Sequence, residues 1–339
     1  MIVIDGSLGE GGGQVLRTSL SLSLLTRTPF RIENIRAKRK SPGLLRQHLT
    51  AVNAATQVGA ASVEGAHVGS STLTFIPTAL RSGDYAFAIG TAGSTMLVLQ
   101  TLLLPLALAD GPSTVELEGG THNPSAPPFD FIDRAFLPLL RRMGAEVELT
   151  LVRPGFYPAG GGKIQVRIAP AKTLARLELD ERGAMTTRCA RAVVANLPWT
   201  IAEREVKVVA EELEWPEDCL QAHTLTGSAG PGNCISVIAG FEQVTDVFTA
   251  FGERGVPAEA VAHNAAKQAR RYLNSNAAVG EHLADQLLLP LAVGGGGSFT
   301  TTPLSGHSLT NIETIGRFVD RAIATEQVSN GVVRVVVGT

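Results

Sequence analysis

The chain has 339 residues, of which 44% are hydrophobic and 18% are charged, and its formal net charge is −2. This composition is typical of a globular protein with a sizeable core, and it excludes a disordered chain or a protein with a basic charge overall. The three cysteines form no CxxC pair and the first residues resemble no signal peptide, so we expect a cytoplasmic protein without disulfides or zinc.

The first segment predicts a β-α-β-α-β-β unit. Residues 1–5 read as a buried strand, glycines follow at positions 9 and 11–13, and an apolar helical pattern runs to Leu25. Pro42 and Gly43 then open a second helix that ends near residue 60 and leads into a strand.

The same order of elements recurs twice, in units of about 80 residues. The second unit has a strand at 84–90, a glycine turn at 90–94, an apolar helix at 96–109, and a helix that begins after Pro128. The apolar run at 96–109 is shorter than the ~20 residues that cross a bilayer, so we expect a buried helix and no membrane contact. The third unit pairs a strand at 173–180 with helices near 278 and 307.

The third unit is interrupted by a long segment with its own strands and helices. Residues 184–275 contain three strand-like runs and helices predicted at 201–214 and 258–272. We therefore predict an α/β (α+β) protein with a three-unit core at 1–183 and 276–339, and a smaller inserted α/β domain at 184–275.

The glycine-rich loop at residues 6–14 is the first candidate ligand site. Glycines let the backbone approach a ligand closely, and the amides of a helix N-terminus can bind an anion. The loop matches neither the Walker A pattern nor G-x-G-x-x-G, and a tight strand-to-helix turn would explain its glycines equally well. Glu10 is unusual in this setting, because a carboxylate among glycines can face a metal ion.

A basic run at residues 27–46 is the second candidate. Its arginines suit phosphate contact, although a solvated loop is the common alternative. A predicted helix start brings Arg46, Gln47 and His48 next to this run. Aromatic residues make up only 5% of the chain, which favours recognition of a nucleic-acid end over a long single-stranded track.

Two later segments carry candidate polar groups. His307 follows a glycine and heads a helix, where an accessible neutral imidazole can act as a nucleophile. Helical spacing places His282, Asp285 and Gln286 on one face of a leucine-rich helix. A structural histidine and a solvated helix face remain the alternatives. The loops at 121–128 and 155–162 are rigid and turn-rich, and their residue types alone assign them no chemistry.

Together these segments resemble the RNA 3′-terminal phosphate cyclase family, and the resemblance spans essentially the whole chain. The matching stretches are DGSLGEGGGQVLR, SPGLLRQHLTAV, GTAGSTMLVLQTLLLP, GGTHNPSAPPFDFI, GFYPAGGG, AVGEHLADQLLLP and HSLTNI. The resemblance implies three repeats like the C-terminal domain of bacterial translation initiation factor 3. It also implies ATP-dependent cyclisation of RNA 3′-phosphate ends through a histidine–AMP intermediate.

The resemblance also implies roles for individual residues. His307 would be the nucleophile, and Glu10 would contact Mg²⁺ or Mn²⁺. The residues implied around the adenylate are Gln100, Pro127, Phe131, Asp285 and Gln286. His282 joins them, at a position where relatives often carry tyrosine. The residues implied to bind phosphate or RNA are Arg17, Arg36, Arg39, Gln47 and His48. No DNA-specific role is expected, and a homodimer remains open.

Two other classes of protein remain as alternatives. One is a non-catalytic relative that binds RNA during ribosome assembly. Such relatives lack the nucleophilic histidine, whereas His307 is present here. The other is an enolpyruvyl transferase, in which each of two lobes contains three related units, whereas this chain contains three units in total.

Overall fold

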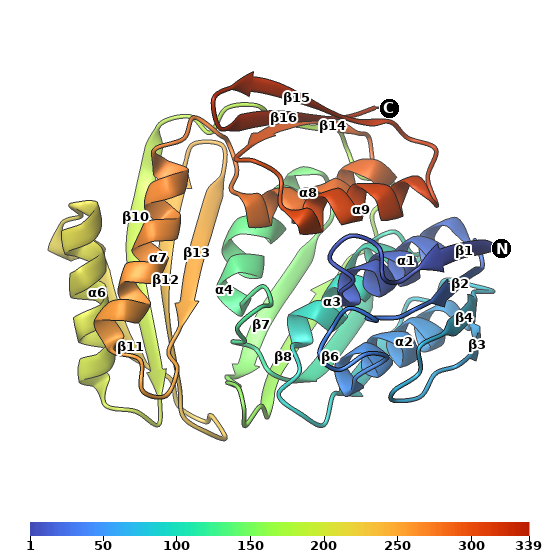
Figure 1. Cartoon of the computed structure of the whole chain (residues 1–339), viewed down its shortest axis with the longest axis horizontal. Helices are drawn as coiled ribbons and strands as arrows, with labels where there is room; N and C mark the ends of the chain where they lie inside the picture. The colour runs from blue at the N-terminus through green and yellow to red at the C-terminus, as the bar shows by residue number, and fades with distance from the viewer. Residues whose placement is uncertain (339) are drawn as a thin grey trace.

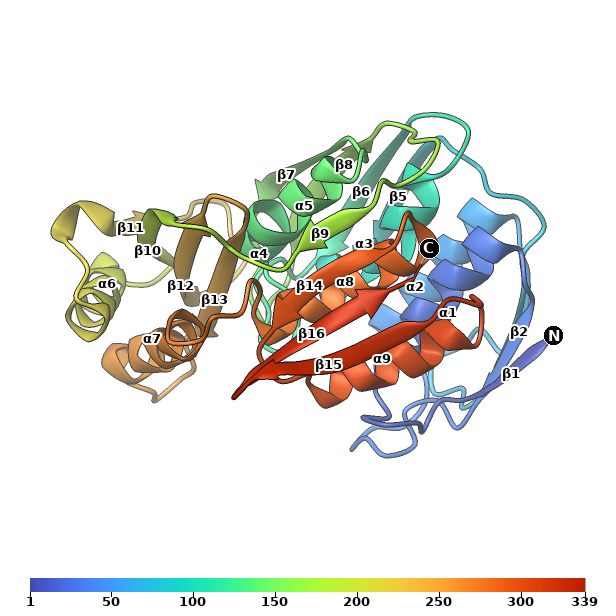
Figure 2. The ribbon, with the colours of Figure 1, turned by 90° about the horizontal axis from the view of Figure 1, so that it is seen from above.

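A computed structural model describes residues 1–338 and contains four separate four-stranded sheets with helices packed against them (Figures 1 and 2). This arrangement confirms the predicted α/β class. Three sheets belong to a core whose elements follow the order β-α-β-α-β-β, and the fourth belongs to the insertion. The likeness to translation initiation factor 3 stays a prediction.

Unit 1 forms a sheet of strand order β1-β2-β4-β3 in which β1 and β2 are parallel. Its elements are β1 (Ile2–Asp5), α1 (Gly13–Thr26), β2 (Phe30–Glu33), α2 (Arg46–Gly59), β3 (Ser62–Glu64) and β4 (Leu73–Ile76).

Unit 2 repeats this topology with the order β5-β6-β8-β7. Its elements are β5 (Asp84–Ala88), α3 (Thr95–Ala107), β6 (Ser113–Gly119), α4 (Phe129–Phe131), the π-helical turn η1 (Ile132–Phe136), α5 (Leu137–Arg142), β7 (Val147–Arg153) and β8 (Gly162–Ile168). The single helix predicted after Pro128 is thus interrupted by a π-turn. Pro138 contributes to the interruption, because it has no N–H to donate to the carbonyl of the preceding turn.

Unit 3 has the order β9-β14-β16-β15, and its sheet lies above α8 and α9 in Figure 1. Its elements are β9 (Leu177–Leu179), α8 (Glu281–Val293), β14 (Gly297–Thr301), α9 (Gly306–Gly316), β15 (Ile323–Ser329) and β16 (Val332–Val337). The segment that forms the fourth sheet lies between β9 and α8 in the chain.

The insertion forms its own sheet, of order β11-β10-β12-β13, and projects to one side of the core (Figure 2). Its elements are β10 (Met185–Ala195), α6 (Trp199–Leu213), the 3₁₀ turn η2 (Glu217–Cys219), β11 (Leu220–Thr224), β12 (Gly232–Phe241), β13 (Thr245–Phe251) and α7 (Ala258–Leu273). The sequence analysis missed β11, a short and largely exposed edge strand with little apolar patterning. The predicted domain boundaries stay predictions.

The core of the three units is one continuous hydrophobic cluster centred on helices α1, α3 and α8. Leu20, Leu102 and Leu287, one from each helix, are all fully buried. These helices are apolar on most of their circumference because neighbouring units cover them on several sides. Within residues 1–338, no helix combines the length and apolarity needed to cross a membrane.

Candidate active site

The N-terminal ends of α1 and α9 meet, although they are about three hundred residues apart in the chain (Figure 1). Gly9 has φ +50° and its Cα packs so closely on Thr310 that a Cβ would clash with the threonine hydroxyl. The amide of Glu10 donates to Thr310 Oγ1 at 3.4 Å. A Cβ on Gly306 would in turn lie 2.6 Å from Glu10 Oε1. The absence of a Cβ at Gly9 and at Gly306 therefore allows the glycine-rich loop to pack against α9, the helix that carries His307.

His307 is exposed and hydrogen-bonded to Gln14 at the start of α1. Gln14 Nε2 donates to both carboxylate oxygens of Asp285, at 2.7 and 2.9 Å. Because an ionised carboxylate only accepts hydrogen bonds, Gln14 must direct its carbonyl oxygen toward His307, where Oε1 lies 3.2 Å from Nδ1. A carbonyl oxygen accepts, so Nδ1 carries the proton and Nε2 keeps its lone pair. The amide bridge thus selects the tautomer in which Nε2 can act as a nucleophile.

Asp285 is held in place from a second direction by α9. Asn311 Nδ2 donates to the main-chain oxygen of Asp285 at 3.2 Å and to Oδ1 at 3.3 Å. The hydroxyl of Thr18 donates to Asn311 Oδ1 at 2.9 Å, which orients this amide. Burial raises the pKa of Asp285, while the hydrogen bond from Gln14 and the nearby charges of His307 and Arg17 oppose that rise. Residues from α1 and α9 therefore fix the position of a carboxylate on α8.

Arg17 and His48 form a polar pair beneath the glycine loop, where a Cβ on Gly13 would clash with both. Burial lowers the pKa of Arg17 to about 10, so the side chain is still a cation at neutral pH. Its Nε has no hydrogen-bond partner within residues 1–338. An unpaired, largely desolvated guanidinium is suited to an anionic ligand.

His48 is neutral at physiological pH. Burial and the charges of Arg17 and Arg36 lower its pKa to about 3. Its Nδ1 accepts a hydrogen bond from the amide of Leu45 at 3.2 Å, which leaves the proton on Nε2, the nitrogen that faces Gly13. His48 can therefore donate one hydrogen bond to a phosphate, but it contributes no charge.

The other predicted phosphate contacts lie around this pair but have different roles in the structure. Arg36 Nη1 donates to the carbonyls of Ser41 and Gly43, at 2.6 and 2.8 Å, and so braces the basic loop. Arg39 lies 3.5 Å from Glu10 and is exposed. Gln47 Oε1 accepts from the amide of Ser94 at 2.7 Å, which connects α2 to the start of α3.

The residues predicted around the adenylate occupy facing elements. Gln100 on α3 donates to Gln286 on α8 at 2.5 Å, and η1, which follows Phe131, packs against α8. Phe131 is 3% exposed, so most of its ring belongs to the core. Pro127 is half-buried in the loop before α4. His282 is set apart from these groups, because its side chain is 64% exposed and its only ion-pair neighbour within residues 1–338 is Glu281, at 3.9 Å.

Glu10 is the candidate metal ligand, and its surroundings are compatible with one. Its carboxylate is half-exposed and the nearest cation, Arg39, is 3.5 Å away. Residues 1–338 contain no cluster of three or more His, Cys, Asp or Glu side chains that could hold a metal without other ligands. A single carboxylate fits Mg²⁺ or Mn²⁺, because such ions in nucleotide sites take most of their ligands from phosphates and water.

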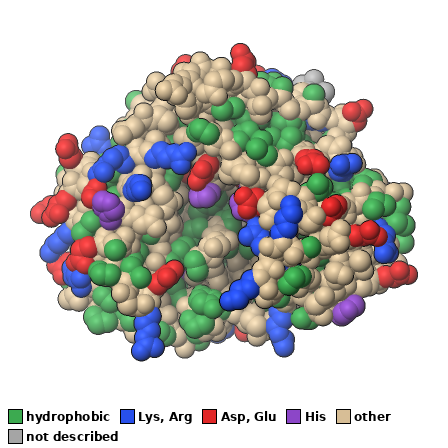
Figure 3. Space-filling view, viewed as in Figure 1, with side chains coloured by type: hydrophobic (Ala, Val, Ile, Leu, Met, Phe, Trp, Pro, Cys, Tyr) green, Lys and Arg blue, Asp and Glu red, His purple; other side chains and the backbone are tan. Residues whose placement is uncertain are grey.

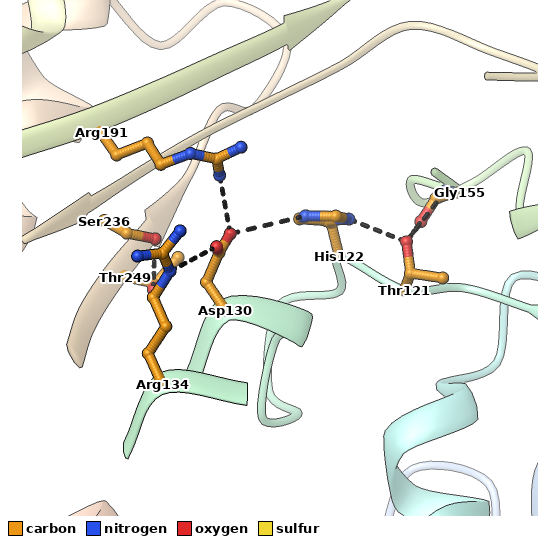
Figure 4. Close-up of polar contacts among 8 residues, drawn as sticks. All are labelled: Thr121, His122, Asp130, Arg134, Gly155, Arg191, Ser236 and Thr249. Atoms are coloured by element: carbon orange, nitrogen blue, oxygen red, sulfur yellow. Dashed lines mark hydrogen bonds and ion pairs between the residues drawn. The ribbon is translucent and has the colours of Figure 1, made fainter. Parts of the chain in front are cut away.

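A buried polar network joins the core to the insertion beside α4 (Figure 4). Asp130 accepts hydrogen bonds from Arg191 on β10 at 2.9 Å and from Arg134 at 3.2 Å. His122 Nε2 lies 4.0 Å from the same carboxylate, and its Nδ1 is 2.8 Å from the hydroxyl of Thr121. Burial lowers the pKa of His122 to about 4, so it is neutral at pH 7.

The space-filling view shows a hollow near the centre of the face seen in Figure 1, with histidine and basic side chains at its margin (Figure 3). It lies below α8, between the insertion and the first two units. This is the region where the N-terminal ends of α1, α8 and α9 converge.

The sequence analysis missed several residues that organise this site. Gln14 and Asn311 were visible within motifs, Gln14 directly after the glycines and Asn311 one helical turn after His307, but neither was selected. The sequence carries no local signal for the contact between Asp130 and Arg191, because the two residues lie 61 positions apart. Asp130 belongs to α4 of the core, and Arg191 belongs to β10 of the insertion.

Comparison with known proteins assigns the chain to a family. The family model for RNA 3′-terminal phosphate cyclase matches residues 8–325. The protein of that name from Ectopseudomonas mendocina is 53% identical over 334 residues, which are 98% of this chain and 97% of the relative. The relative from Koribacter versatilis is 54% identical, and the match covers 94% of this chain and 90% of the relative. The relative from Salmonella typhimurium is 51% identical, and the match covers 98% of this chain and 97% of the relative.

These similarities define the class of protein as cyclase-like along nearly the full length of the chain. The chain belongs to the RNA 3′-terminal phosphate cyclase family. Among solved structures, the enolpyruvyl transferase NikO from Streptomyces tendae matches 99% of this chain and 48% of its own, with 13% identity and a TM-score of 0.39. That similarity is too weak to bear on fold or activity.

Proposed function

We propose that this chain uses ATP to convert an RNA 3′-terminal phosphate into a 2′,3′-cyclic phosphate, with release of AMP and pyrophosphate. The observation that carries the proposal is the position of His307. Its Nε2 is accessible, its tautomer is set by Gln14, and a cation with an unpaired Nε, Arg17, lies nearby on the same helix as Gln14. Membership of the cyclase family supports the same reaction class.

In the first step, Nε2 of His307 attacks the α-phosphorus of ATP. A P–N bond forms, the bond between the α-phosphorus and the bridging oxygen breaks, and pyrophosphate leaves with the electron pair. The ring becomes cationic while Nδ1 keeps its proton. Gln14 accepts that proton's hydrogen bond, and the carboxylate of Asp285 polarises the amide, so the growing positive charge is stabilised.

In the second and third steps, AMP moves from the protein to the RNA and then leaves. An oxygen of the RNA 3′-phosphate attacks the AMP phosphorus and breaks the P–N bond, which gives RNA(3′)pp(5′)A. The adjacent 2′-hydroxyl then attacks the RNA phosphorus and loses its proton to solvent. This forms the cyclic ester, breaks the bond between that phosphorus and the bridging oxygen, and releases AMP. In this proposal Arg17, Arg36 and Arg39 neutralise phosphate charge, and His48 and Gln47 donate hydrogen bonds.

Different residues would hold the nucleotide and the metal. Gln100 and Gln286 would meet the adenine or ribose with Pro127 and Phe131 behind them, while exposed His282 would stack at the entrance. Glu10 would be the protein ligand of Mg²⁺ or Mn²⁺. When bound, such an ion supplies charge neutralisation at the phosphates. A cytoplasmic location fits the three free cysteines, and a homodimer stays a prediction.

The test is self-adenylylation with ATP labelled at the α-phosphate. We expect wild-type protein with Mg²⁺ or Mn²⁺ to form a labelled adduct that survives hydroxylamine and is lost in acid. His307→Ala should form none, because no other nitrogen is held in this position. His223→Ala, at an exposed histidine of the insertion, is the matched control and should label normally.

Two results would count against this proposal. A labelled adduct on His307→Ala would assign the nucleophile to another residue. Wild-type protein that binds 3′-phosphorylated RNA without ever forming an adduct would favour the alternative, a non-catalytic RNA-binding relative.

A further inference from the structure

A second cavity lies beside the candidate active site and has no role in the steps described above. Its volume is about 520 Å³, within the ~300–1,000 Å³ typical of small-molecule sites. Its lining includes the turn at 91–94, the loop at 123–126, and the pair Tyr157-Pro158. These last two segments are the turn-rich loops to which the sequence alone assigned no chemistry.

The walls of the cavity are fixed before any ligand binds. Asn123, which is largely buried, donates to the carbonyl of Ala92 at 2.5 Å and so ties two of the loops together. Gly160 has φ +68° and packs on Ala92 so closely that a Cβ would lie 2.8 Å from its Cα. The third loop is thereby held against the first. A preformed pocket binds its ligand with a smaller loss of conformational entropy.

The cavity adjoins residues of the candidate site on α2 and α3. Gln47 lines it and accepts from the amide of Ser94, which also lines it. The next residue, His48, packs against Gly13 beneath the glycine loop. Leu97, which also lines the cavity, lies one turn before Gln100, which contacts Gln286. A ligand in this cavity would therefore have one end at the phosphate-binding residues and one side toward the adenylate.

The residues that line the cavity are neutral. Within residues 1–338, the lining includes amides, hydroxyls, a leucine, prolines and one phenol ring, and it contains no charged side chain. A basic group follows close in the chain, because Arg46 directly precedes the lining residue Gln47, and its Nη1 would be 3.9 Å from a Cβ on Gly90. This chemistry suits an uncharged base and sugar inside, with a chain phosphate at the edge.

Tyr157 provides a flat aromatic surface at the cavity. Its side chain is 67% exposed, which is unusual for a ring of this size on a rigid loop. The preceding residue anchors it, since Phe156 is 2% exposed and stacks on His122 with ring centroids 4.9 Å apart. An exposed ring on an anchored stretch of backbone, beside a neutral pocket, is a platform on which a nucleic-acid base can stack.

We propose that this cavity receives the 3′-terminal nucleoside of the RNA, with its base stacked on Tyr157 and its 3′-phosphate directed toward Gln47 and His48. The inference rests on the proposed function and extends it from the phosphate to the nucleoside. It accounts for substrate recognition in a chain with few aromatic residues, because a single stacked base positions the reacting end.

The test compares two substrates on wild-type enzyme, Tyr157→Ala and Tyr157→Phe. One substrate is a 3′-phosphorylated oligoribonucleotide, and the other has the same sequence with an abasic terminal ribose 3-phosphate. Single-turnover transfer of AMP to each substrate is measured separately from His307 labelling. We expect wild type and Tyr157→Phe to prefer the intact end by about tenfold, as for loss of one stacked base, and Tyr157→Ala to lose that preference.

The outcomes separate this inference from the proposed function. Failure of wild type to label His307 would remove the function itself. Equal use of both substrates by the wild type, or an undiminished preference in Tyr157→Ala, would overturn the nucleoside pocket while leaving the labelling reaction intact. A Tyr157→Ala protein that instead needs more ATP for labelling would assign the cavity to the adenine of ATP. Because the abasic substrate tests the wild type directly, the result does not depend on how the variants fold.

Discussion

At the scale of single residues, the orientation of His307 depends on the neutral side-chain amide of Gln14. Gln14 is the one side chain hydrogen-bonded to both His307 and Asp285 within residues 1–338. A carboxylate at position 14 would repel Asp285, and a cation there would offer no acceptor for the Nδ1 proton of His307. A neutral group with one donor and one acceptor satisfies both neighbours, which explains why glutamine follows the glycines.

We predict that Gln14→Met slows self-adenylylation about 100-fold without preventing it. Methionine has a similar length but removes the acceptor that keeps the proton on Nδ1, so His307 can rotate and change tautomer. The rate of label incorporation at saturating ATP is the measurement. Gln57→Met, at an exposed position of α2, is the control and should label at the wild-type rate. A Gln14→Met enzyme as fast as wild type would show that the amide bridge does not orient the nucleophile.

At the scale of elements, the site exists because two helix starts approach each other more closely than ordinary side chains allow. Gly9 precedes α1, and Thr310 begins the second turn of α9. The contact between them also positions Glu10, whose amide donates to the same threonine hydroxyl. The glycine is therefore required both for its left-handed φ of +50° and for the absence of a Cβ.

We predict that Gly9→Ala lowers the rate of self-adenylylation at least tenfold, because the loop must move away from α9 and carry Glu10 with it. The control is Gly255→Ala, which has a comparable φ of +86° but no atom within 4 Å of the added Cβ. Both changes should lower the free energy of unfolding by about 1–2 kcal/mol through backbone strain alone. Equal activity of the two variants would show that strain, and not the close approach to Thr310, accounts for any loss.

At the scale of the whole molecule, the insertion is joined to the core by buried polar contacts. Asp130 of the core binds Arg191 of β10, and Asp246 of β13 accepts from the amide of Gly280 at 2.7 Å, directly before α8. Burial raises the pKa of Asp246 to about 7. Arg182 adds a further contact, because its guanidinium lies over the ring of Tyr272, 4.9 Å from the ring centroid. The insertion thus contacts α4 and the start of α8, and both of these elements lie next to residues proposed to bind the adenylate.

We predict that Arg191→Met lowers the free energy of unfolding by about 3 kcal/mol, because it leaves the buried Asp130 carboxylate with only the half-exposed Arg134 as a charged partner. Adding Asp130→Asn to Arg191→Met should restore part of that loss, since the buried charge disappears. Urea denaturation of the two single variants and the double variant measures the coupling.

The matched control for this cycle is Arg204→Met, which removes an exposed ion pair with Glu259 inside the insertion. Exposed pairs contribute about 1 kcal/mol or less, so this variant should remain close to wild type. If Arg191→Met were no more destabilised than Arg204→Met, the Asp130 network would not be what secures the insertion.

The local sequence pattern was sufficient to predict structural features that depend on residues close together in the chain. The apolar helix at 96–109 and the helix start at Arg46 were both predictable, because periodicity and proline placement act over a few residues. His307 could be selected because a glycine before a histidine at a helix start is a local signal. The edge strand β11 was not predictable, since its pairing with β10 decides it.

By itself, the sequence determined the α/β class and, through resemblance, the family that the comparisons support. Only the tertiary structure decided which polar groups meet: the bridge from Asp285 through Gln14 to His307, the unpaired Nε of Arg17, and the cavity beside Tyr157. The reason is physical. Periodicity and turn chemistry are set by residues close in the chain, whereas hydrogen bonds between helix ends 271 or 293 positions apart exist only after the units pack together.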